Sequence, residues 1–327
     1  MKTILITGGA GYIGSVITAL FLNEGYHVKV ADLLWFNKYI PSLYEANPNY
    51  TFIKGDIRDI DFLKNIMENV DYVIHAAAVV GDPASKKFPE LTYTINQEAS
   101  IKLIDMAKNY NIRGFIFLST CSNYGISEGL ANEDSILKPL SLYSETKVNV
   151  ERYLIDKAHK LDWIICRLST VYGVSPRMRF DLTVNDFALN AFTKKFLDIF
   201  LPYTHRPYIH VSDVGKVMLN IMEKFDITKR NIFNVGFNKE NYQKIEIAKA
   251  ISTSIPGIRI DITEKGSDTR DYRVDFSKLQ RYLDVSNSYR VEDGIREVVD
   301  LLRSGKIHNP QDTVYYNTSP DLGVLNR

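Results

Sequence analysis

The chain has 327 residues, 45% of them hydrophobic and 24% charged, so it can bury a sizeable core in one large domain or two closely joined domains. Its formal net charge of +1 gives no electrostatic reason to expect a nucleic acid or an anionic membrane as a partner. The only cysteines, Cys121 and Cys166, have no metal-like spacing, and no stretch approaches the roughly 20 apolar residues of a membrane span. We therefore expect a cytoplasmic protein without a metal.

Short β-branched runs alternate with segments of helical length along the first half of the chain. The predicted strands are residues 3–7, 27–31, 50–54, 71–75, 114–118 and 163–167. The predicted helices between them lie near residues 11–24, 59–69, 92–110 and 144–160. Continuous apolar character in several of the strands is typical of strands that are covered on both faces. The alternation predicts an α/β fold built on a doubly wound parallel sheet.

After residue 168 the pattern loosens. Helices are predicted at 185–196, 212–224, 241–254 and 291–303, with short strands at 231–235 and 258–262. We expect a first domain over residues 1–168 and a smaller C-terminal lobe over 169–304 that interleaves with it. Residues 305–327 contain turn residues and no period, which predicts an irregular tail.

The first predicted strand runs directly into a Gly-x-x-Gly-x-x-Gly turn that opens a helix. Gly8 permits the tight turn, Gly11 lets the backbone approach a pyrophosphate, and Gly14 allows close packing of strand and helix. An ordinary glycine-rich turn is the alternative. Asp32, however, follows the second strand at about the spacing expected for a carboxylate that holds an adenosine ribose. Together the residues predict a Rossmann domain that binds NAD.

A tyrosine and a lysine, Tyr143 and Lys147, are spaced to lie on one face of a helix. In that arrangement the ammonium can lower the pKa of the phenol, which makes Tyr143 a plausible general base. Tyr50 and Tyr153 also precede a lysine by four residues, so the spacing alone proves little. Only Tyr143 opens a helix soon after a strand that ends at Thr120, and we expect the other two tyrosines to be structural.

The ordered motifs over residues 1–304 resemble the nucleotide-sugar epimerase/dehydratase family of extended short-chain dehydrogenase/reductases. Besides the glycine-rich turn, they are Gly55–Asp59, His75–Ala78, Asn96, Thr120, the Tyr143–Lys147 pair, Arg167–Gly173 and Arg206–Asp213. The resemblance implies that the lobe over 169–304 mainly binds a nucleotide-diphosphate sugar, and that Thr120, Tyr143 and Lys147 are catalytic. Implied cofactor contacts are Gly8, Gly11, Tyr12, Ile13, Gly14, Asp32, Asp56, Ile57, Ala76, Ala77, Ala78, Asn96, Ser119, Tyr143, Lys147 and Val171. Implied substrate contacts are Thr120, Thr170, Arg177, Asn185, Arg206 and Arg270.

Several of these residues also have a purely structural explanation. Asp56 could be a solvated turn aspartate, and His75 could be a histidine at a strand end whose hydrogen bonds are satisfied within the protein. Arg206 and Arg270 could form surface ion pairs, but guanidinium groups suit a diphosphate bidentately, and we favour that role. For Asn185 the simpler explanation is a helix cap.

Departures from the family pattern narrow the expected reaction. Dehydratases of the family carry Asp-Glu after the catalytic threonine, where this chain has Cys121 and Ser122, so we do not expect dehydration. Thr170 replaces an asparagine that many members have, which leaves the substrate's placement open. The segments 175–182, 80–83 and 270–273 most resemble members that make modified sugars for surface polysaccharides, including the GDP-heptose 4-dehydrogenase type.

The resemblance implies oxidation of the sugar at carbon 4 by NAD, through a 4-keto species. An epimerase would return the hydride to the other face, and a dehydrogenase would release the ketone; the catalytic residues serve both outcomes. A non-catalytic NAD-dependent sensor is a third possibility, against which the intact catalytic set argues. The resemblance also implies a homodimer joined through helices 92–110 and 144–160. The second of these carries more than one apolar stripe, with Val148, Val150, Leu154, Ile155 and Leu161.

Overall fold

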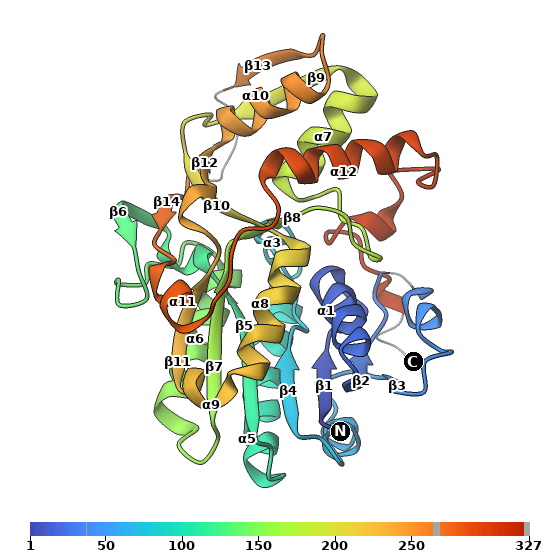
Figure 1. The fold of residues 1–327 in the computed structure, drawn as a ribbon, viewed down its shortest axis with the longest axis vertical. Helices are drawn as coiled ribbons and strands as arrows, with labels where there is room; N and C mark the ends of the chain where they lie inside the picture. The colour runs from blue at the N-terminus through green and yellow to red at the C-terminus, as the bar shows by residue number, and fades with distance from the viewer. Residues whose placement is uncertain (37, 264–268, 324–327) are drawn as a thin grey trace.

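The centre of the protein is a seven-stranded parallel sheet with the strand order β11-β7-β5-β4-β1-β2-β3 (Figure 1). The computed structural model describes residues 1–36, 38–263 and 269–323. The strands are β1 (Thr3–Thr7), β2 (His27–Asp32), β3 (Tyr50–Lys54), β4 (Tyr72–His75), β5 (Gly114–Thr120), β7 (Trp163–Leu168) and β11 (Asn231–Val235). The order reverses between β1 and β4, as in a doubly wound Rossmann sheet, so the predicted fold class is confirmed.

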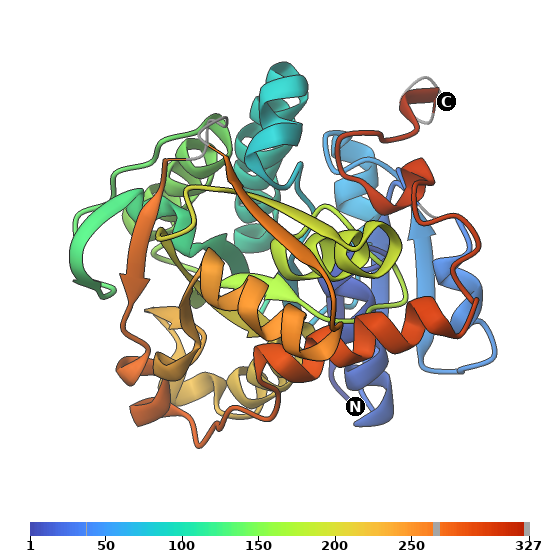
Figure 2. The ribbon, with the colours of Figure 1, turned by 90° about the horizontal axis from the view of Figure 1, so that it is seen from above.

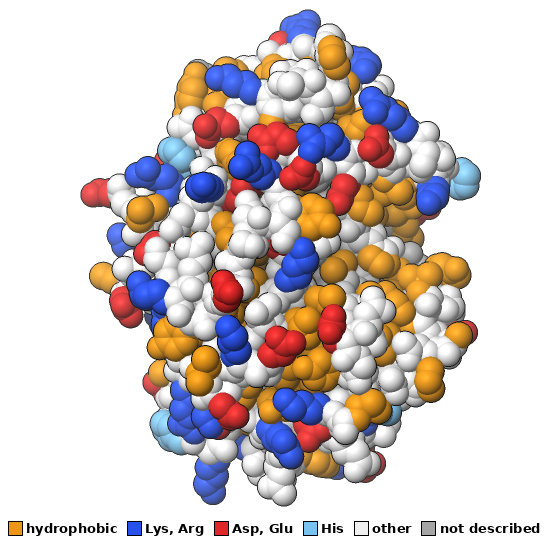
Figure 3. Space-filling view, viewed as in Figure 1, with side chains coloured by type: hydrophobic (Ala, Val, Ile, Leu, Met, Phe, Trp, Pro, Cys, Tyr) orange, Lys and Arg blue, Asp and Glu red, His pale blue; other side chains and the backbone are white. Residues whose placement is uncertain are grey.

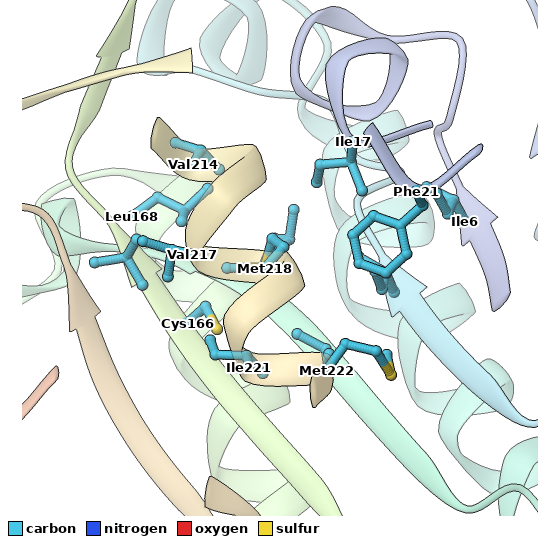
Figure 4. Close-up of a cluster of buried hydrophobic side chains, with 14 of the residues drawn as sticks. Ile6, Ile17, Phe21, Cys166, Leu168, Val214, Val217, Met218, Ile221 and Met222 are labelled. Atoms are coloured by element: carbon cyan, nitrogen blue, oxygen red, sulfur yellow. The ribbon is translucent and has the colours of Figure 1, made fainter. Parts of the chain in front are cut away.

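Helices cover both faces of this sheet. On one face α1 (Tyr12–Asn23) packs against α8 (Val211–Glu223), and on the other face lie α2 (Ile60–Met67), α5 (Ser100–Asn109) and α6 (Leu142–Lys157). Figure 4 shows the apolar side of α8 between α1 and the strands; its labelled side chains are Ile6, Ile17, Phe21, Cys166, Leu168, Val214, Val217, Met218, Ile221 and Met222. Burying both faces explains why the central strands read as continuous apolar runs.

The helix predicted over 92–110 is divided into three parts. It consists of α4 (Pro89–Tyr93), a π-helical turn (Thr94–Ala99) and α5. Single π-helical turns inside α-helices widen the backbone and often occur near functional sites. Here the turn contains the buried side chain of Asn96.

The C-terminal lobe packs α7 (Thr183–Lys194), α10 (Lys244–Ser254) and α12 (Val291–Arg303) around its own apolar core, and Figure 2 shows α10 and α12 side by side. Three small sheets join this lobe: β12-β10-β8, β13-β9 and β14-β6. Their strands are β6 (Ile126–Ala131), β8 (Thr170–Tyr172), β9 (Phe196–Phe200), β10 (His205–His210), β12 (Asn241–Gln243), β13 (Arg259–Thr263) and β14 (Asp271–Val274). The short helices are α3 (Asp82–Lys87), α9 (Phe225–Thr228) and α11 (Ser277–Tyr282), with 3-10 turns at Ile40–Leu43, Cys121–Tyr124, Asn238–Glu240 and Thr313–Tyr315.

The chain passes repeatedly between the two parts. The strand β11 pairs with β7 at the edge of the large sheet, although it follows residue 168 by more than sixty positions. In the opposite direction, β6 of the first part pairs with β14 of the second. The two parts of the chain are therefore interleaved, and a division at residue 168 does not separate two sheets, because β11 and α8 belong to the large sheet and its covering layer.

Between residues 305 and 323 the described part of the tail is mostly irregular, with a 3-10 turn at Thr313–Tyr315, and backbone hydrogen bonds attach it to the body. Phe180 N–H donates to the carbonyl of Tyr315 at 3.1 Å, and Asp321 N–H donates to the carbonyl of Trp35 at 2.8 Å. The tail thereby connects the lobe to the loop that follows β2.

Lysines and arginines lie among aspartates and glutamates on the face shown in Figure 3. Within the described ranges, no helix is both long and apolar enough to cross a bilayer. The same residues contain no cluster of three or more His, Cys, Asp or Glu side chains that could hold a metal ion.

Candidate cofactor cleft and catalytic site

A cleft opens at the carboxyl ends of β1, β4 and β5, where the strand order reverses and ligands of doubly wound sheets bind. Most of the residues predicted to contact the cofactor line it. They are Gly8, Gly11, Tyr12, Ile13, Gly14, Asp32, Asp56, Ile57, Ala76, Ala77, Ala78, Ser119, Tyr143 and Lys147.

The glycine-rich turn forms a cradle that side chains would fill. Gly8 has φ +72°, and a Cβ there would lie 2.6 Å from the backbone nitrogen of Ala77. A side chain on Gly14 would collide with the carbonyl oxygen of Gly8. Gly11 caps α1 without a side-chain hydrogen bond, so no side chain claims the first N–H groups of the helix. Such a helix start binds a phosphate, and the turn therefore fits a dinucleotide.

Asp32 ends β2 with its carboxylate at the cleft. The carboxylate accepts hydrogen bonds from the backbone N–H of Ala10 at 3.0 Å and of Leu34 at 2.8 Å, which fix its position. Burial raises its pKa, and the two amides oppose that shift. Asp56 also lines the cleft. Its carboxylate forms an ion pair with the guanidinium of Arg58 at 2.6 Å.

The three predicted catalytic residues are brought together at the carboxyl end of β5. The helix α6 begins at Leu142 behind a capping box centred on Ser141, which places Tyr143 in its first turn. Thr120, the last residue of β5, lies near Tyr143, and its hydroxyl favours the ionised form of the phenol. One turn further on, the ammonium of Lys147 donates to the carbonyl of Leu118 at 2.9 Å. Tyr143 and Lys147 thus line one end of the cleft, and Thr120 lies near Tyr143 without lining the cleft itself.

The electrostatics differ from the sequence prediction in one respect. Burial raises the pKa of Tyr143 to about 12, although Arg179, Arg270 and the hydrogen bond from Thr120 oppose the shift. Burial also lowers the pKa of Lys147 to about 7, against the charge of Glu151. The expected net lowering of the phenol's pKa by Lys147 is therefore wrong for the protein alone, because desolvation outweighs the nearby cations.

Two predicted cofactor residues do not line the cleft. The side-chain amide of Asn96 accepts from Val79 N–H at 2.8 Å and donates to the carbonyl of Val79 at 2.9 Å, so it holds the backbone beside the cleft. Val171 is buried in the apolar core between the sheet and α8. Both assignments are corrected to structural roles.

Asn185 and Arg177 differ from their predicted substrate roles. Asn185 is buried, accepts from Gly173 N–H at 3.0 Å and donates to the carbonyl of Arg179 at 2.9 Å, so it fixes the loop after β8 and is not a helix cap. Arg177 lines the cofactor cleft together with Asp32.

Arg206 and Arg270, by contrast, lie together. Arg206 donates to the backbone carbonyl of Arg270 and sits 5.1 Å from the ring centre of Tyr272. Arg270 forms an ion pair with Asp82 at 3.1 Å and donates to the hydroxyl of Ser122 at 3.0 Å. These two guanidinium groups form the candidate diphosphate site. Thr170, also predicted to contact substrate, begins β8 opposite Tyr208 of β10.

His75, Tyr50 and Tyr153 have structural contacts within the protein. His75 is fully buried, bonded to Thr7 at 2.7 Å and to Ser100 at 2.8 Å, and burial lowers its pKa to about 3. Tyr50 lies within β3, and Tyr153 donates from α6 to Asp105 at 2.6 Å.

Sequence reasoning missed other residues of the cleft, among them Arg179 and Asn317. Arg179 is held by Asp181 at 2.8 Å, and Asp181 also accepts from the backbone N–H of Asn317 at 2.8 Å. The Arg-Phe-Asp sequence could have suggested the first pair. Nothing in the aperiodic tail indicated that Asn317 reaches the cofactor cleft.

A Rossmann sheet with this glycine-rich turn, Asp32 and the Tyr143–Lys147 pair defines a nicotinamide-dependent enzyme of the short-chain dehydrogenase/reductase class. The NAD dependent epimerase/dehydratase family matches residues 4–236, and the chain belongs to this family. Its cofactor is NAD.

Three known proteins illustrate the relationship. The chain is 28% identical to a UDP-glucose 4-epimerase of Lactobacillus helveticus, over 86% of this chain and 90% of that protein. It is 31% identical to a dTDP-D-glucose 4,6-dehydratase of Dictyostelium discoideum, over 77% of this chain and 62% of that protein. The crystal structure of UDP-glucuronic acid 4-epimerase from Bacillus cereus, in complex with UDP-glucuronic acid and NAD, superposes with a TM-score of 0.84 at 27% identity, covering 93% of this chain and 99% of that one.

Proposed function

We propose that the protein is an NAD-dependent 4-epimerase of nucleotide-diphosphate sugars. The observation that carries the proposal is the pair of Tyr143 and Lys147 in the lining of the cofactor cleft, with Thr120 near Tyr143 at the end of β5. The neighbouring pair of Arg206 and Arg270 suits a diphosphate, because guanidinium groups bind phosphates through two parallel hydrogen bonds. When bound, NAD supplies a reversible acceptor for the hydride of carbon 4.

The protein's own groups move the proton and hold the sugar. Tyr143 takes the proton of the carbon-4 hydroxyl as phenolate, a form that the positive charges of Lys147 and of the oxidised nicotinamide would favour when NAD is bound, and Thr120 hydrogen-bonds the reacting oxygen. Lys147, whose ammonium donates to the carbonyl of Leu118, would hold the nicotinamide ribose. Arg270 exchanges Asp82 for the substrate's phosphate. The 4-keto sugar then rotates in the site, so that hydride returns to its other face. Tyr143 gives the proton back to the carbon-4 oxygen, which forms the alcohol of inverted configuration.

The residues after Thr120 favour this reaction over a 4,6-dehydration. Elimination of water needs a general acid and a general base, each worth about 10²–10⁴-fold in rate. Cys121 is buried against the carbonyl of Arg167, and burial raises the pKa of its thiol. Ser122 accepts a hydrogen bond from Arg270 and carries no carboxylate. Neither residue can supply the acid and base that dehydratases place there.

The C-terminal tail favours an epimerase over a 4-dehydrogenase. Asn317 lines the cofactor cleft and donates to the carbonyl of Val80 at 3.2 Å, so the tail lies against the bound cofactor's site. A dehydrogenase must release reduced cofactor in every cycle, whereas an epimerase regenerates NAD in place. A tail that keeps NAD bound between turnovers therefore suits an epimerase. The resemblance of segments 175–182, 80–83 and 270–273 to GDP-heptose 4-dehydrogenases supports the alternative.

One experiment distinguishes these functions. The protein is incubated with UDP-, GDP-, CDP- and dTDP-sugars, starting with UDP-glucose and UDP-glucuronate, and the products are followed by nuclear magnetic resonance and by reduced-nicotinamide absorbance. We expect a carbon-4 epimer without net reduction of NAD. A ketone formed with stoichiometric reduced cofactor would identify a dehydrogenase, and the methyl doublet of a 6-deoxy sugar a dehydratase. Binding without any turnover would identify a sensor.

A further inference from the structure

Arg177 stands in the loop between β8 and α7 and is only 3% exposed. It lines the cofactor cleft, and the centre of its guanidinium lies 4.0 Å from the ring centre of Phe36, in the loop after β2. A cation over an aromatic face is held in place without losing its hydrogen-bond donors. The contact with Phe36 therefore holds the guanidinium in the cleft and uses none of its N–H donors.

Those donors are not used by the protein. Among the residues that the structure describes, Nε and Nη2 of Arg177 are buried and have no hydrogen-bond partner. Arg179, two positions later, contrasts with it, because both its Nε and Nη2 donate to Asp181, at 2.8 and 3.1 Å. A buried charge without a partner costs several kcal/mol, so such a group is typical of a site for an anion.

Asp32 does not fill that role. Its carboxylate oxygens accept from the backbone of Ala10 and Leu34, and no ion pair joins Asp32 to Arg177 among the described residues. Burial and the charge of Arg179 lower the pKa of Arg177 to about 9, which leaves the guanidinium charged at neutral pH. The cation thus remains available on the wall of the cleft.

The start of α1 supplies a second positive feature nearby. Two hydrogen bonds join the loop of Arg177 to Tyr12, the first residue of α1: the hydroxyl of Tyr12 donates to the carbonyl of Gly173 at 2.7 Å, and the hydroxyl of Ser175 donates to the carbonyl of Tyr12 at 2.7 Å. The loop of Arg177 is thus tied directly to the helix start. The uncapped start of that helix and Arg177 both line the cleft, and both carry positive potential.

We propose that Arg177 is a cofactor-binding residue that donates to the diphosphate of NAD and completes, with the start of α1, a two-sided site for it. A 2′-phosphate on the adenosine ribose is the other anion that could reach this wall. The carboxylate of Asp32 would repel that group, so the diphosphate is favoured. The proposal does not depend on which sugar the enzyme converts.

The test uses Arg177→Met, which keeps the apolar stem over Phe36 and removes the charge. Protein freed of nucleotide is titrated calorimetrically with adenosine, ADP, NAD and adenosine 2′,5′-bisphosphate. We expect affinity for ADP and NAD to fall at least about tenfold, as for the loss of a charge-assisted hydrogen bond, while affinity for adenosine changes less than about twofold. Arg259→Met is the control, because that side chain is 74% exposed and pairs with Asp261 on the far lobe.

The other outcomes overturn the proposal. An equal loss for adenosine and ADP would show that Arg177 acts through packing, and a loss confined to the 2′,5′-bisphosphate would move it to a 2′-phosphate site. Unchanged affinity for all four ligands would exclude an anion-binding role. Thermal unfolding provides a check on folding: without nucleotide, Arg177→Met should melt no lower than the parent protein, since it loses an uncompensated charge, but NAD should raise its melting temperature less. Arg177→Lys should restore part of the ADP affinity.

Discussion

Glu151 and Arg167 form an ion pair at 2.7 Å, and the two side chains are only 1% and 4% exposed. Glu151 also accepts from the hydroxyl of Ser119 and from Asn123 at 2.8 Å, so the pair joins the end of β5 to α6 and β7. It lies one helical turn beyond Lys147, and its negative charge raises the lysine's pKa against the effect of burial. The carboxylate of Glu151 therefore favours the charged form of the ammonium from behind the site.

Removing this pair should shift the pH dependence of the reaction. Glu151→Gln alone would leave Arg167 buried without its partner, at a cost of about 3–5 kcal/mol, so the variant to use is Glu151→Gln with Arg167→Met. Without the carboxylate, the pKa of Lys147 falls below its value of about 7. The ammonium then loses its proton at lower pH, and kcat/KM should decline at lower pH than in the parent protein. If the maximum of kcat/KM fell but the pH at which it declines did not change, the Glu151–Arg167 pair would have a purely structural role.

Tyr143→Phe should lower kcat by about 10²–10⁴-fold, because it removes the hydroxyl that accepts the sugar's proton. Affinity for NAD and the melting temperature should change little, since one hydroxyl is lost from a cleft and not from a packed core. Tyr153→Phe is the matched control on the same helix, and it should retain nearly full activity. If Tyr143→Phe retained most of the activity, the base would have to be another group.

The protein should bind NAD more tightly than NADP. The carboxylate of Asp32 accepts hydrogen bonds from a ribose 2′-hydroxyl and repels a 2′-phosphate. Asp32→Asn should lower the affinity for NAD by about tenfold or more and reduce the ratio of NAD affinity to NADP affinity. The control Asp198→Asn, on the exposed side of β9, should change neither the affinity nor the ratio. Calorimetric titration with both cofactors measures this. Equal affinities in the parent protein would contradict the assignment of Asp32.

Shortening the tail should speed the exchange of cofactor. A chain ending at Gln311 lacks the hydrogen bonds that Tyr315, Asn317 and Asp321 make to the body, whereas a chain ending at Gly323 retains them. We expect NAD to dissociate about tenfold faster from the first chain, equivalent to roughly 1.4 kcal/mol of lost contacts, and at the parental rate from the second. Stopped-flow displacement of bound NAD gives the rates. Identical rates would mean that the tail does not retain the cofactor.

We expect a homodimer joined through α5 and α6, with twice the protomer mass of 37.4 kDa in light scattering at micromolar concentration. The structure changes the argument for it. Val148, Val150, Leu154 and Leu161 are buried inside the protomer, and of the five apolar residues that suggested an outer stripe only Ile155 is exposed, at 41%. Ile155→Glu should therefore weaken the dimer, while Ile227→Glu, on the exposed side of α9, should not. A protomer mass for the parent protein would contradict the prediction.

What the sequence predicts well is local. The central strands and the catalytic helix follow from apolar runs and from the spacing of Tyr143 and Lys147, which depend on residues close together in the chain. The residues whose predicted roles differ from the structure contact partners that are distant in the sequence. Asn96 and Asn185 are polar residues whose amides bind backbone, and a sequence cannot distinguish that from binding a ligand. Arg177 meets Phe36, and Asn317 meets Val80, only after the chain has folded.

The place of β11 at the edge of the large sheet also bears on how the protein is made. The sheet face that α8 covers remains open until residue 223 of the 327 has left the ribosome, and β7 lacks its neighbour on that side until residue 235 has followed. An exposed strand edge and apolar face invite pairing with other chains. The nascent chain therefore has an interval of aggregation risk while the segment from residue 169 to 235 is synthesised. A stop codon within that segment should yield insoluble fragments and not a free NAD-binding domain.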